Sequence, residues 1–334
     1  MLLYGANNNT VLLVTVTATI VLLFCNSSAQ IARGIRTKRR IDGSSVNCVG
    51  TESETVCGTR KRVLRRDVYS YLGVRFAEAP IGNLRFRPPL PAQPRQGKFL
   101  AKIPSNACYQ AREDSPLHSV MMWSPNTEIS EDCLHLNIWA PKPKESPKGV
   151  SQEKYPVMVW IYGGGLFSGS PSLKIYNGAA MASRKQVVVV NINYRTNVFG
   201  FLFLDTDEVP GNVGLLDQLQ ALRWIRENIA NFGGDPSKVT LFGESAGAFS
   251  VTAHMMSPKS VQYFRNAVVQ SGSIDCYFGT STPEKTLNES IAILEQVASL
   301  GCNQNLVEDS INFGTKIIVL RKHVMDCSYL TSNG

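Results

Sequence analysis

Residues 243–247 (GESAG) place Ser245 two positions from a glycine on each side. Residues 239–242 are typical of a short strand, and residues 246–256 are typical of a helix. A strand-to-helix turn of this kind exposes a serine hydroxyl, and the glycines let strand and helix approach without a Cβ clash. The alternative is a tight structural turn with an incidental serine. The context favours a nucleophilic Ser245.

A second glycine cluster, residues 163–165, follows the apolar run 155–162. Glycines expose consecutive backbone amides, so the N–H groups of Gly164, Gly165 and Ala246 are predicted to stabilise an oxyanion. Losing one such donor typically costs about 100- to 1000-fold in rate. A glycine triplet alone is more often only a loop, but its pairing with the serine turn favours acyl-transfer chemistry.

The elements that position these residues alternate between two periodicities. Residues 155–162 and 186–194 are nearly continuous apolar, β-branched runs, which suit strands buried on both faces of a mostly parallel sheet. Residues 214–232 have helical spacing and end at a Gly-Gly-Asp-Pro sequence. Residues 264–270 predict another strand. The alternation predicts an α/β fold.

Composition excludes several classes of protein. Hydrophobic residues make up 43% of the 334 residues and charged ones 18%, which excludes a disordered or fibrous chain. The net charge is +8, but residues 30–66 hold ten Lys or Arg against three acids, so the remaining chain is nearly neutral. We therefore expect no nucleic-acid partner. The sequence contains no zinc-ligand spacing and no phosphate-binding loop, so neither a metal nor another cofactor is expected.

The N-terminus is typical of an exported protein. Residues 11–24 form an unbroken apolar run, which is shorter than the about 20 residues that span a bilayer. We predict a signal peptide over residues 1–29, with a membrane anchor as the alternative. Residues 30–66 are predicted to be a basic leader that is either a solvated segment or a processing site. The protein is expected to be secreted.

Cysteine usage agrees with export. Seven cysteines remain after the signal, and none forms a C-x-x-C pair, so three disulfides and one free thiol are the simplest count. Proximity alone suggests Cys48 with Cys57. Asn288-Glu289-Ser290 is a glycosylation sequon, usable if the chain is secreted.

The sequence resembles the type-B carboxylesterases, and within them the cholinesterases, over about residues 55–311. The motifs that carry the resemblance are YLGVRFAEAPIGNLRFRPP from Tyr71, SEDCLHLNIWAP from Ser130, WIYGGGLFSGS from Trp160, NYRTNVFGFL from Asn193, GNVGLLDQLQALRWI from Gly211 and FGGDPSKVTLFGESAG from Phe232. The resemblance implies the α/β-hydrolase fold, with a central mostly parallel sheet flanked by helices. It also implies hydrolysis of a small-molecule ester through an acyl-serine intermediate.

The resemblance assigns roles residue by residue. Ser245 matches the nucleophile, and Gly164, Gly165 and Ala246 match the oxyanion donors. Glu244 matches a buried acid that supports the site electrostatically. The implied structural links are the ion pairs Arg85–Glu131 and Arg195–Asp217 and the disulfide Cys108–Cys133. By the count of the remaining cysteines, Cys302 pairs with Cys327 if it pairs at all, at a spacing longer than the family's, and Cys276 is free.

Three aromatic residues bear on the substrate. Trp123 aligns with the tryptophan that holds a quaternary ammonium group in cholinesterases, and an indole face attracts such a cation by roughly 0.5–2 kcal/mol. The alternative is an ordinary aromatic residue in a disulfide loop. Phe278 aligns near the acyl pocket, and Phe167 replaces a gorge tyrosine. These residues suggest a choline ester.

The resemblance fails at the base and the acid of a catalytic triad, which should follow the serine in the chain. His118 and His135 precede Ser245, His254 lies in the following helix, and His323 has no family context. From Asn312 the resemblance fades, and residues 312–334 are an unmatched tail. We therefore expect the N-terminal portion of an esterase, inactive alone. A non-catalytic neuroligin-like adhesion module and a general carboxylesterase stay as alternatives. Oligomeric state and any membrane attachment through a longer C-terminus are left open.

Overall fold

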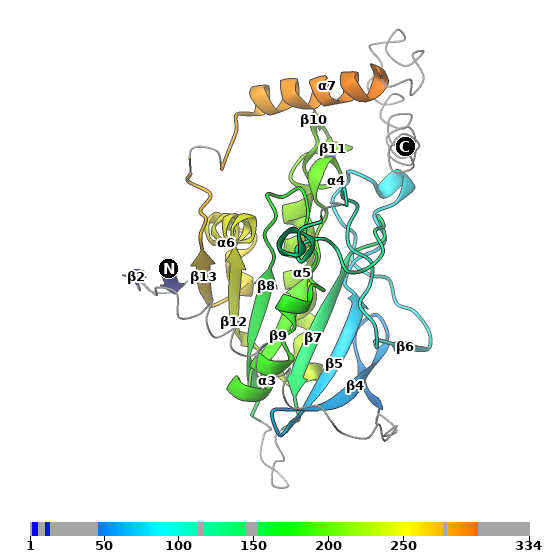
Figure 1. Cartoon of the computed structure of the whole chain (residues 1–334), viewed down its shortest axis with the longest axis vertical. Coiled ribbons are helices and arrows are strands. Elements are labelled where there is room, and N and C mark those ends of the chain that lie inside the picture. The colour runs from blue at the N-terminus through cyan, green and yellow to red at the C-terminus, as the bar shows by residue number, and fades with distance from the viewer. Residues whose placement is uncertain are drawn as a thin grey trace.

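The computed structural model describes residues 2–5, 11–13, 46–112, 116–143, 153–276 and 279–299, and it contains a large central sheet (Figure 1). The main sheet has 11 strands, in the order β2-β1-β13-β12-β8-β9-β7-β5-β4-β3, with β6 pairing with β4. Its strands are β1 (Leu2–Gly5), β2 (Val11–Leu13), β3 (Val46–Gly50), β4 (Thr55–Val63), β5 (Arg66–Arg75), β6 (Lys98–Leu100), β7 (His135–Pro141), β8 (Tyr155–Ile161), β9 (Val188–Ile192), β12 (Gly234–Glu244) and β13 (Asn266–Gln270). A separate two-stranded sheet joins β10 (Phe203–Thr206) and β11 (Val209–Pro210).

The helices of the described chain are α2 (His118–Met121), α3 (Ala179–Lys185), α4 (Asn197–Phe201), α5 (Val213–Asn228), α6 (Ala246–Met256) and α7 (Pro283–Ser299). Four short 3-10 helices are η1 (Gly82–Leu84), η2 (Lys174–Tyr176), η3 (Ile229–Phe232) and η4 (Val261–Tyr263). No helix in the described ranges is both long enough and apolar enough to cross a membrane.

The centre of the sheet is parallel and its flanks are antiparallel. β12 runs parallel to β8 and β13, and β8 runs parallel to β9. β7, β5 and β4 continue the sheet in antiparallel order. The predicted α/β fold is confirmed, with the parallel pairing concentrated in the strands nearest Ser245.

Helices cover both faces of this sheet because its buried strands are apolar on both sides. Ile138 belongs to the main core together with Leu222 of α5 and Val251 of α6. The next residue, Trp139, packs in a separate cluster with Ala182 of α3. Since successive strand residues point to opposite faces, α3 lies on the face opposite α5 and α6.

The sheet begins earlier in the chain than the sequence suggests. β3 and β4 lie inside residues 30–66, for which the sequence predicts a basic leader, and Val56 and Cys57 are buried. The run of basic residues at the end of β4 obscures the apolar residues at its start. Of the predicted signal, residues 2–5 and 11–13 form β1 and β2, which pair beside β13. The rest of the signal and the tail 312–334 lie outside the described residues.

Two predicted disulfides are present. Cys48 lies opposite Cys57 in the β3–β4 pair and is bonded to it, and Cys108 is bonded to Cys133. Cys276 is a half-buried free thiol, as expected. Cys302 and Cys327 fall outside the described part of the chain, so their pairing stays a prediction.

Both predicted ion pairs are buried. The Arg195 guanidinium donates to both carboxylate oxygens of Asp217 at 2.7 and 2.8 Å, and Asp217 is fully buried. The same guanidinium donates to the Arg87 carbonyl at 2.8 Å. Arg85 pairs with Glu131 in the same two-pronged way. These contacts fix the segment after β9 to α5 and to the Arg-rich turn near residue 86.

We predict that Asp217→Asn lowers the free energy of unfolding by about 3–5 kcal/mol, because it leaves the Arg195 charge buried and uncompensated. Denaturant unfolding followed by circular dichroism measures this. The control is Asp67→Asn, which removes the partly exposed partner of Arg60 at 4.0 Å and should cost about 1 kcal/mol or less. Equal losses in both variants would show that the buried pair has no special structural weight.

Candidate active site

Ser245 lies in a sharp turn between β12 and α6. Its backbone has φ 55° and ψ −123°, and it occupies the N-cap position of α6 without a capping hydrogen bond from its side chain. The Ser245 N–H donates to the Gln270 carbonyl at the end of β13, at 2.9 Å. The turn is thus held from the side by the neighbouring strand. The predicted strand–turn–helix context of Ser245 is confirmed.

The glycines around Ser245 are required by close packing. A Cβ on Gly247 would lie 2.1 Å from the Ile161 carbonyl oxygen, and a Cβ on Gly243 would lie 2.6 Å from the Gly247 backbone. Neither position has room for a side chain. These contacts seat the first turn of α6 directly on the end of β8, which leads into the glycine loop.

The loop after β8 contacts the serine turn. A Cβ on Gly163 would lie 3.0 Å from the Ser245 Cβ and 2.5 Å from the Glu244 carbonyl oxygen. Gly164 and Gly165 have φ values of 121° and 63°, which side chains rarely adopt, and both are exposed. Within the described residues, the N–H groups of Gly164, Gly165 and Ala246 donate to no other protein atom. The structure therefore brings unused donors to the surroundings of Ser245.

Glu244 differs from the expectation of a buried acid. Its side chain is exposed, and Oε2 lies 3.2 Å from the position that a Cβ of Gly163 would occupy. Partial desolvation raises the pKa of Glu244. Burial, followed by the Glu244 charge, raises the pKa of Tyr176 to about 12. The described elements cover the backbone of the turn but leave the Glu244 carboxylate open to solvent. A position next to a buried turn therefore does not by itself bury the side chain.

The aromatic residues predicted for substrate binding are not gathered around Ser245 by any described contact. Trp123 follows α2 inside the Cys108–Cys133 loop and is 49% exposed. Phe167 is 71% exposed, with its ring near Gly165. Phe278 lies outside the described residues. The structure thus places Trp123 and Phe167 on the surface and leaves their roles as predictions.

The histidines described by the structure do not supply a base. His118 is exposed on α2, before Ser245 in the chain. His254 is buried in α6, and its ring nitrogens contact Ser260 Oγ and Gln218 Oε1, both at 2.9 Å. Burial lowers the pKa of His254 to about 4. Its ring is held within the core by these two partners.

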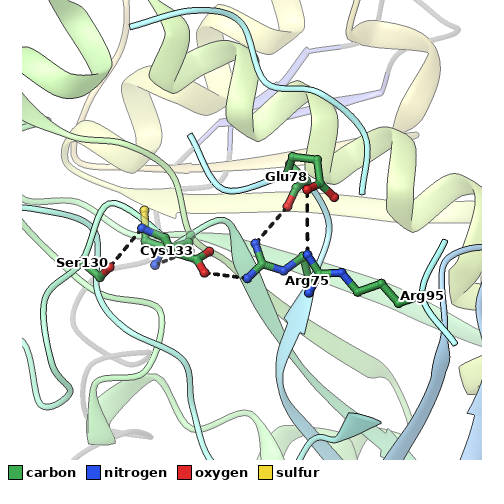
Figure 2. Close-up of polar contacts among 8 residues, drawn as sticks. Arg75, Glu78, Arg95, Ser130 and Cys133 are labelled. Carbon is green, nitrogen blue, oxygen red and sulfur yellow. Dashed lines mark hydrogen bonds and ion pairs between the residues drawn. The ribbon is translucent and has the colours of Figure 1, made fainter. Parts of the chain in front are cut away.

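A polar network that the sequence did not reveal supports the Cys108–Cys133 loop. In Figure 2, Arg75 points toward the segment that carries Ser130 and Cys133, and Glu78 meets Arg95. Arg75 pairs with Asp132 at 2.7 Å, and the Asp132 N–H donates to Ser130 Oγ at 3.1 Å. These contacts fix the end of the loop that contains Trp123.

His135 is buried beside this network. Burial, and then the nearby Arg75 charge, lowers the pKa of His135 to about 4. Its Nδ1 has no hydrogen-bond partner among the described atoms, nor has Asp132 Oδ1. Spacing alone gave no signal for this cluster, because its members come from separate segments of the chain.

Most of this chain is similar in sequence to one known family of proteins. The carboxylesterase family profile matches residues 45–316. Over 251 residues the chain is 47% identical to acetylcholinesterase 4 of Caenorhabditis briggsae, covering 75% of this chain and 40% of that protein. Over 238 residues it is 48% identical to acetylcholinesterase of Danio rerio, covering 70% of this chain and 37% of that protein.

A third relative extends the match along the chain. The sequence is 39% identical to acetylcholinesterase of Leptinotarsa decemlineata over 292 residues, covering 84% of this chain and 44% of the beetle protein. The chain thus spans about two fifths of the length of the curated relatives it matches. A parallel sheet with a serine at a strand-to-helix turn defines an α/β hydrolase. The chain belongs to the carboxylesterase family.

The buried histidines make stability depend on pH. The pKa of His254 is about 4 in the folded protein, against an ordinary value of about 6.5 in the unfolded chain. Between these values the unfolded chain binds more protons, so we predict that the free energy of unfolding falls as the pH is lowered from 7 to 4.5. Urea unfolding at several pH values measures the slope.

In the same experiment His254→Gln, which removes one titrating ring and keeps hydrogen-bonding capacity, should fall less steeply with pH than the wild type. His118→Gln is the control, because its ring is exposed in both states and its replacement should leave the slope unchanged. A wild-type slope retained in His254→Gln would show that this ring does not couple to folding.

Proposed function

We propose that the protein is a serine esterase that hydrolyses small carboxylic esters, with choline esters as the favoured class. The observation that supports this most directly is the position of Ser245, turned out by a positive φ beside three unused N–H donors. Ser245 Oγ attacks the ester carbonyl carbon and gives up its proton to a base. The resulting oxyanion accepts hydrogen bonds from Gly164, Gly165 and Ala246.

The second half of the reaction passes through an acyl-serine ester. The tetrahedral intermediate expels the alcohol, which receives a proton from the base, and an acyl-Ser245 ester remains. Water then attacks the acyl carbon with the help of the same base and releases the acid. The α6 N-terminus adds its positive dipole end to the stabilisation of both oxyanions.

The base and its orienting carboxylate are proposed to come from outside the described residues. His118 precedes Ser245 in the chain, and both His135 and His254 are buried with strongly lowered pKa values. An uncharged buried ring with two side-chain partners, as in His254, is not free to exchange protons with Ser245. The described residues without that base are therefore expected to turn over esters poorly, because loss of the base forfeits most of a triad's contribution.

Labelling of Ser245 tests the nucleophile. The protein purified from its natural source is treated with a fluorophosphonate and mapped by mass spectrometry, with the adduct expected on the peptide that holds Ser245. In recombinant protein of the same length, Ser245→Ala should abolish labelling. Ser257→Ala, at the other end of α6, is the control and should label like the wild type. Labelling that survives in Ser245→Ala would refute the assignment.

The choline preference rests on Trp123. Trp123 is 49% exposed, so its side chain is accessible to a ligand. An aromatic face attracts a permanent ammonium charge with little desolvation cost. The relatives named above are acetylcholinesterases, which supports the same substrate class. The exposed Glu244 carboxylate adds longer-range attraction for a cation near Ser245.

A pair of substrates tests this preference. A choline ester and its uncharged isostere are compared by kcat/KM in the wild type and in Trp123→Ala. The variant is expected to lose about 10-fold or more on the charged ester alone, which corresponds to about 1–2 kcal/mol of transition-state binding. Phe99→Ala, which removes a 37% exposed ring from β6, is the control for loss of an exposed aromatic residue with no expected part in substrate binding. An equal loss on both esters would make Trp123 structural and the protein a general carboxylesterase.

Secretion and glycosylation complete the proposal. Two disulfides in the described chain are typical of an oxidising compartment. Asn288 is exposed on α7, so its amide is accessible for a glycan. The hydroxyl of Ser290, two residues further along the sequon, accepts a hydrogen bond from the Phe203 N–H at 3.3 Å, which ties this part of α7 to β10.

A further inference from the structure

The hairpin between β4 and β5 concentrates positive charge far from the proposed active site. Its basic residues are Arg60, Lys61, Arg62, Arg65 and Arg66, and all five are exposed. Val63 pairs with Arg66, so the connecting turn consists of Leu64 and Arg65 alone. The one acidic residue of this hairpin tip, Asp67, lies 4.0 Å from Arg60.

The C-terminal end of α3 adds to the same surface. Ser183 Oγ donates to the Val63 carbonyl at 2.6 Å, and Arg66 Nη1 donates to the Ser183 carbonyl at 3.4 Å. The next two residues of α3, Arg184 and Lys185, are exposed. We call this surface the basic edge; it consists of Arg60, Lys61, Arg62, Arg65, Arg66, Arg184 and Lys185. Figure 1 shows α3 beside the lower ends of the neighbouring strands.

The charges of the basic edge are poorly neutralised. Within the described part of the chain, Arg60 is its only member in an ion pair, and that pair is at the 4.0 Å limit. Like charges held together on a rigid hairpin repel one another, and a bound polyanion relieves that repulsion. Arginine is also suited to hold oxyanions through two parallel N–H donors.

The turn itself does not explain its arginine. Leu64 and Arg65 have φ values of 45° and 69°, a left-handed conformation that favours Asn or Gly in a two-residue hairpin turn. A glycine at position 65 would fit this backbone better than arginine does. Arg65 therefore adds a positive charge at a position where the backbone conformation favours glycine over arginine.

Strand pairing places the basic edge at the opposite end of the sheet from Ser245. Val68 of β5 pairs with Pro141 at the end of β7, and Trp139 of β7 pairs with Val189 at the start of β9. The hairpin tip therefore lies at the amino ends of β9 and β8, whereas Ser245 follows the carboxyl end of β12. A ligand on the basic edge leaves the serine turn accessible.

The oxidising surroundings that the disulfides indicate limit which polyanions the basic edge can meet. The Cys48–Cys57 disulfide joins β4 to its neighbour β3, and disulfides persist in oxidising, extracellular surroundings. Anionic lipids are concentrated on the cytoplasmic leaflet, on the reducing side of the membrane. From this charge, geometry and setting we propose that the basic edge binds a sulfated polysaccharide and thereby tethers the protein with its serine turn facing away.

Heparin is the probe for this surface. Binding is measured by isothermal titration in about 0.15 M salt, and elution from heparin resin by a salt gradient. The test variant is Arg65→Gly with Arg184→Ser and Lys185→Ser, in which the glycine suits the turn and the other two positions are exposed. The matched control removes three exposed basic residues elsewhere, with Arg223→Ser, Lys259→Ser and Arg265→Ser.

The expected result is that the test variant binds heparin about tenfold or more weakly and elutes at lower salt, since each basic contact to an anionic surface adds favourably. The control variant should stay within about twofold of the wild type. Thermal midpoints of all three proteins verify that folding is intact. Equal weakening in both triple variants, or heparin binding unchanged in the test variant, would overturn the proposal.

A membrane surface is the competing polyanion, and vesicles of phosphatidylserine in phosphatidylcholine test it. Leu64 is 58% exposed at the hairpin tip and is the side chain that a bilayer would take up. We expect heparin to bind more tightly than these vesicles, with Leu64→Ser leaving heparin binding unchanged. Tighter vesicle binding that Leu64→Ser abolishes would assign the basic edge to a membrane and overturn the proposal.

Discussion

The close approach of α6 to the end of β8 is the constraint on which the candidate site depends. Gly247 is seated so tightly against Ile161 that no side chain fits between them, and a Cβ on Gly163 would lie 2.5 Å from the Glu244 carbonyl oxygen in the serine turn. Ser245 takes a positive φ in this arrangement, a strain of about 1–3 kcal/mol that the surrounding structure must maintain. The buried core beneath it, which includes Val159 and Leu241 of the parallel strands and Val251 of α6, supplies that support.

The remaining ion pairs and disulfides do not contact Ser245 but hold the segments around it. Arg195 and Asp217 hold the segment after β9 to α5, and the Cys108–Cys133 disulfide closes the loop that carries Trp123. These groups have no contact with a reacting atom. Their physical role is to keep irregular segments in one arrangement around a rigid sheet, because loops without such links lose order most easily.

Charge is distributed unevenly over the molecule. Half of the basic residues in the N-terminal part of the sequence lie together on the β4–β5 hairpin, beside α3. Around Ser245 the nearest described acid is Glu244, which is exposed and has a raised pKa. The two ends of the sheet thus have different electrostatic character, and the sheet itself holds them apart.

The sequence by itself determined the main elements and the strand-to-helix turn that holds Ser245. Helix α6 occupies the predicted residues 246–256, and β8, β9 and α5 follow their predicted runs within a few residues, because apolar periodicity and glycine punctuation are local properties. The Gly-x-Ser-x-Gly turn could be recognised for the same reason. Motif resemblance supplied the Cys108–Cys133 disulfide and both buried ion pairs, which the structure contains.

Only the tertiary structure decided what is buried and what lies together. Glu244 is exposed although its neighbours are packed, Arg75 meets Asp132 from a distant strand, and α3 brings Arg184 beside the β4–β5 hairpin. The basic residues of segment 46–63 hide its strands from a sequence-based prediction. β4 joins the sheet by pairing with β5, and β3 joins it by pairing with β4. Such relations depend on contacts between segments far apart in the chain, and no local pattern encodes which side of a residue another element will cover.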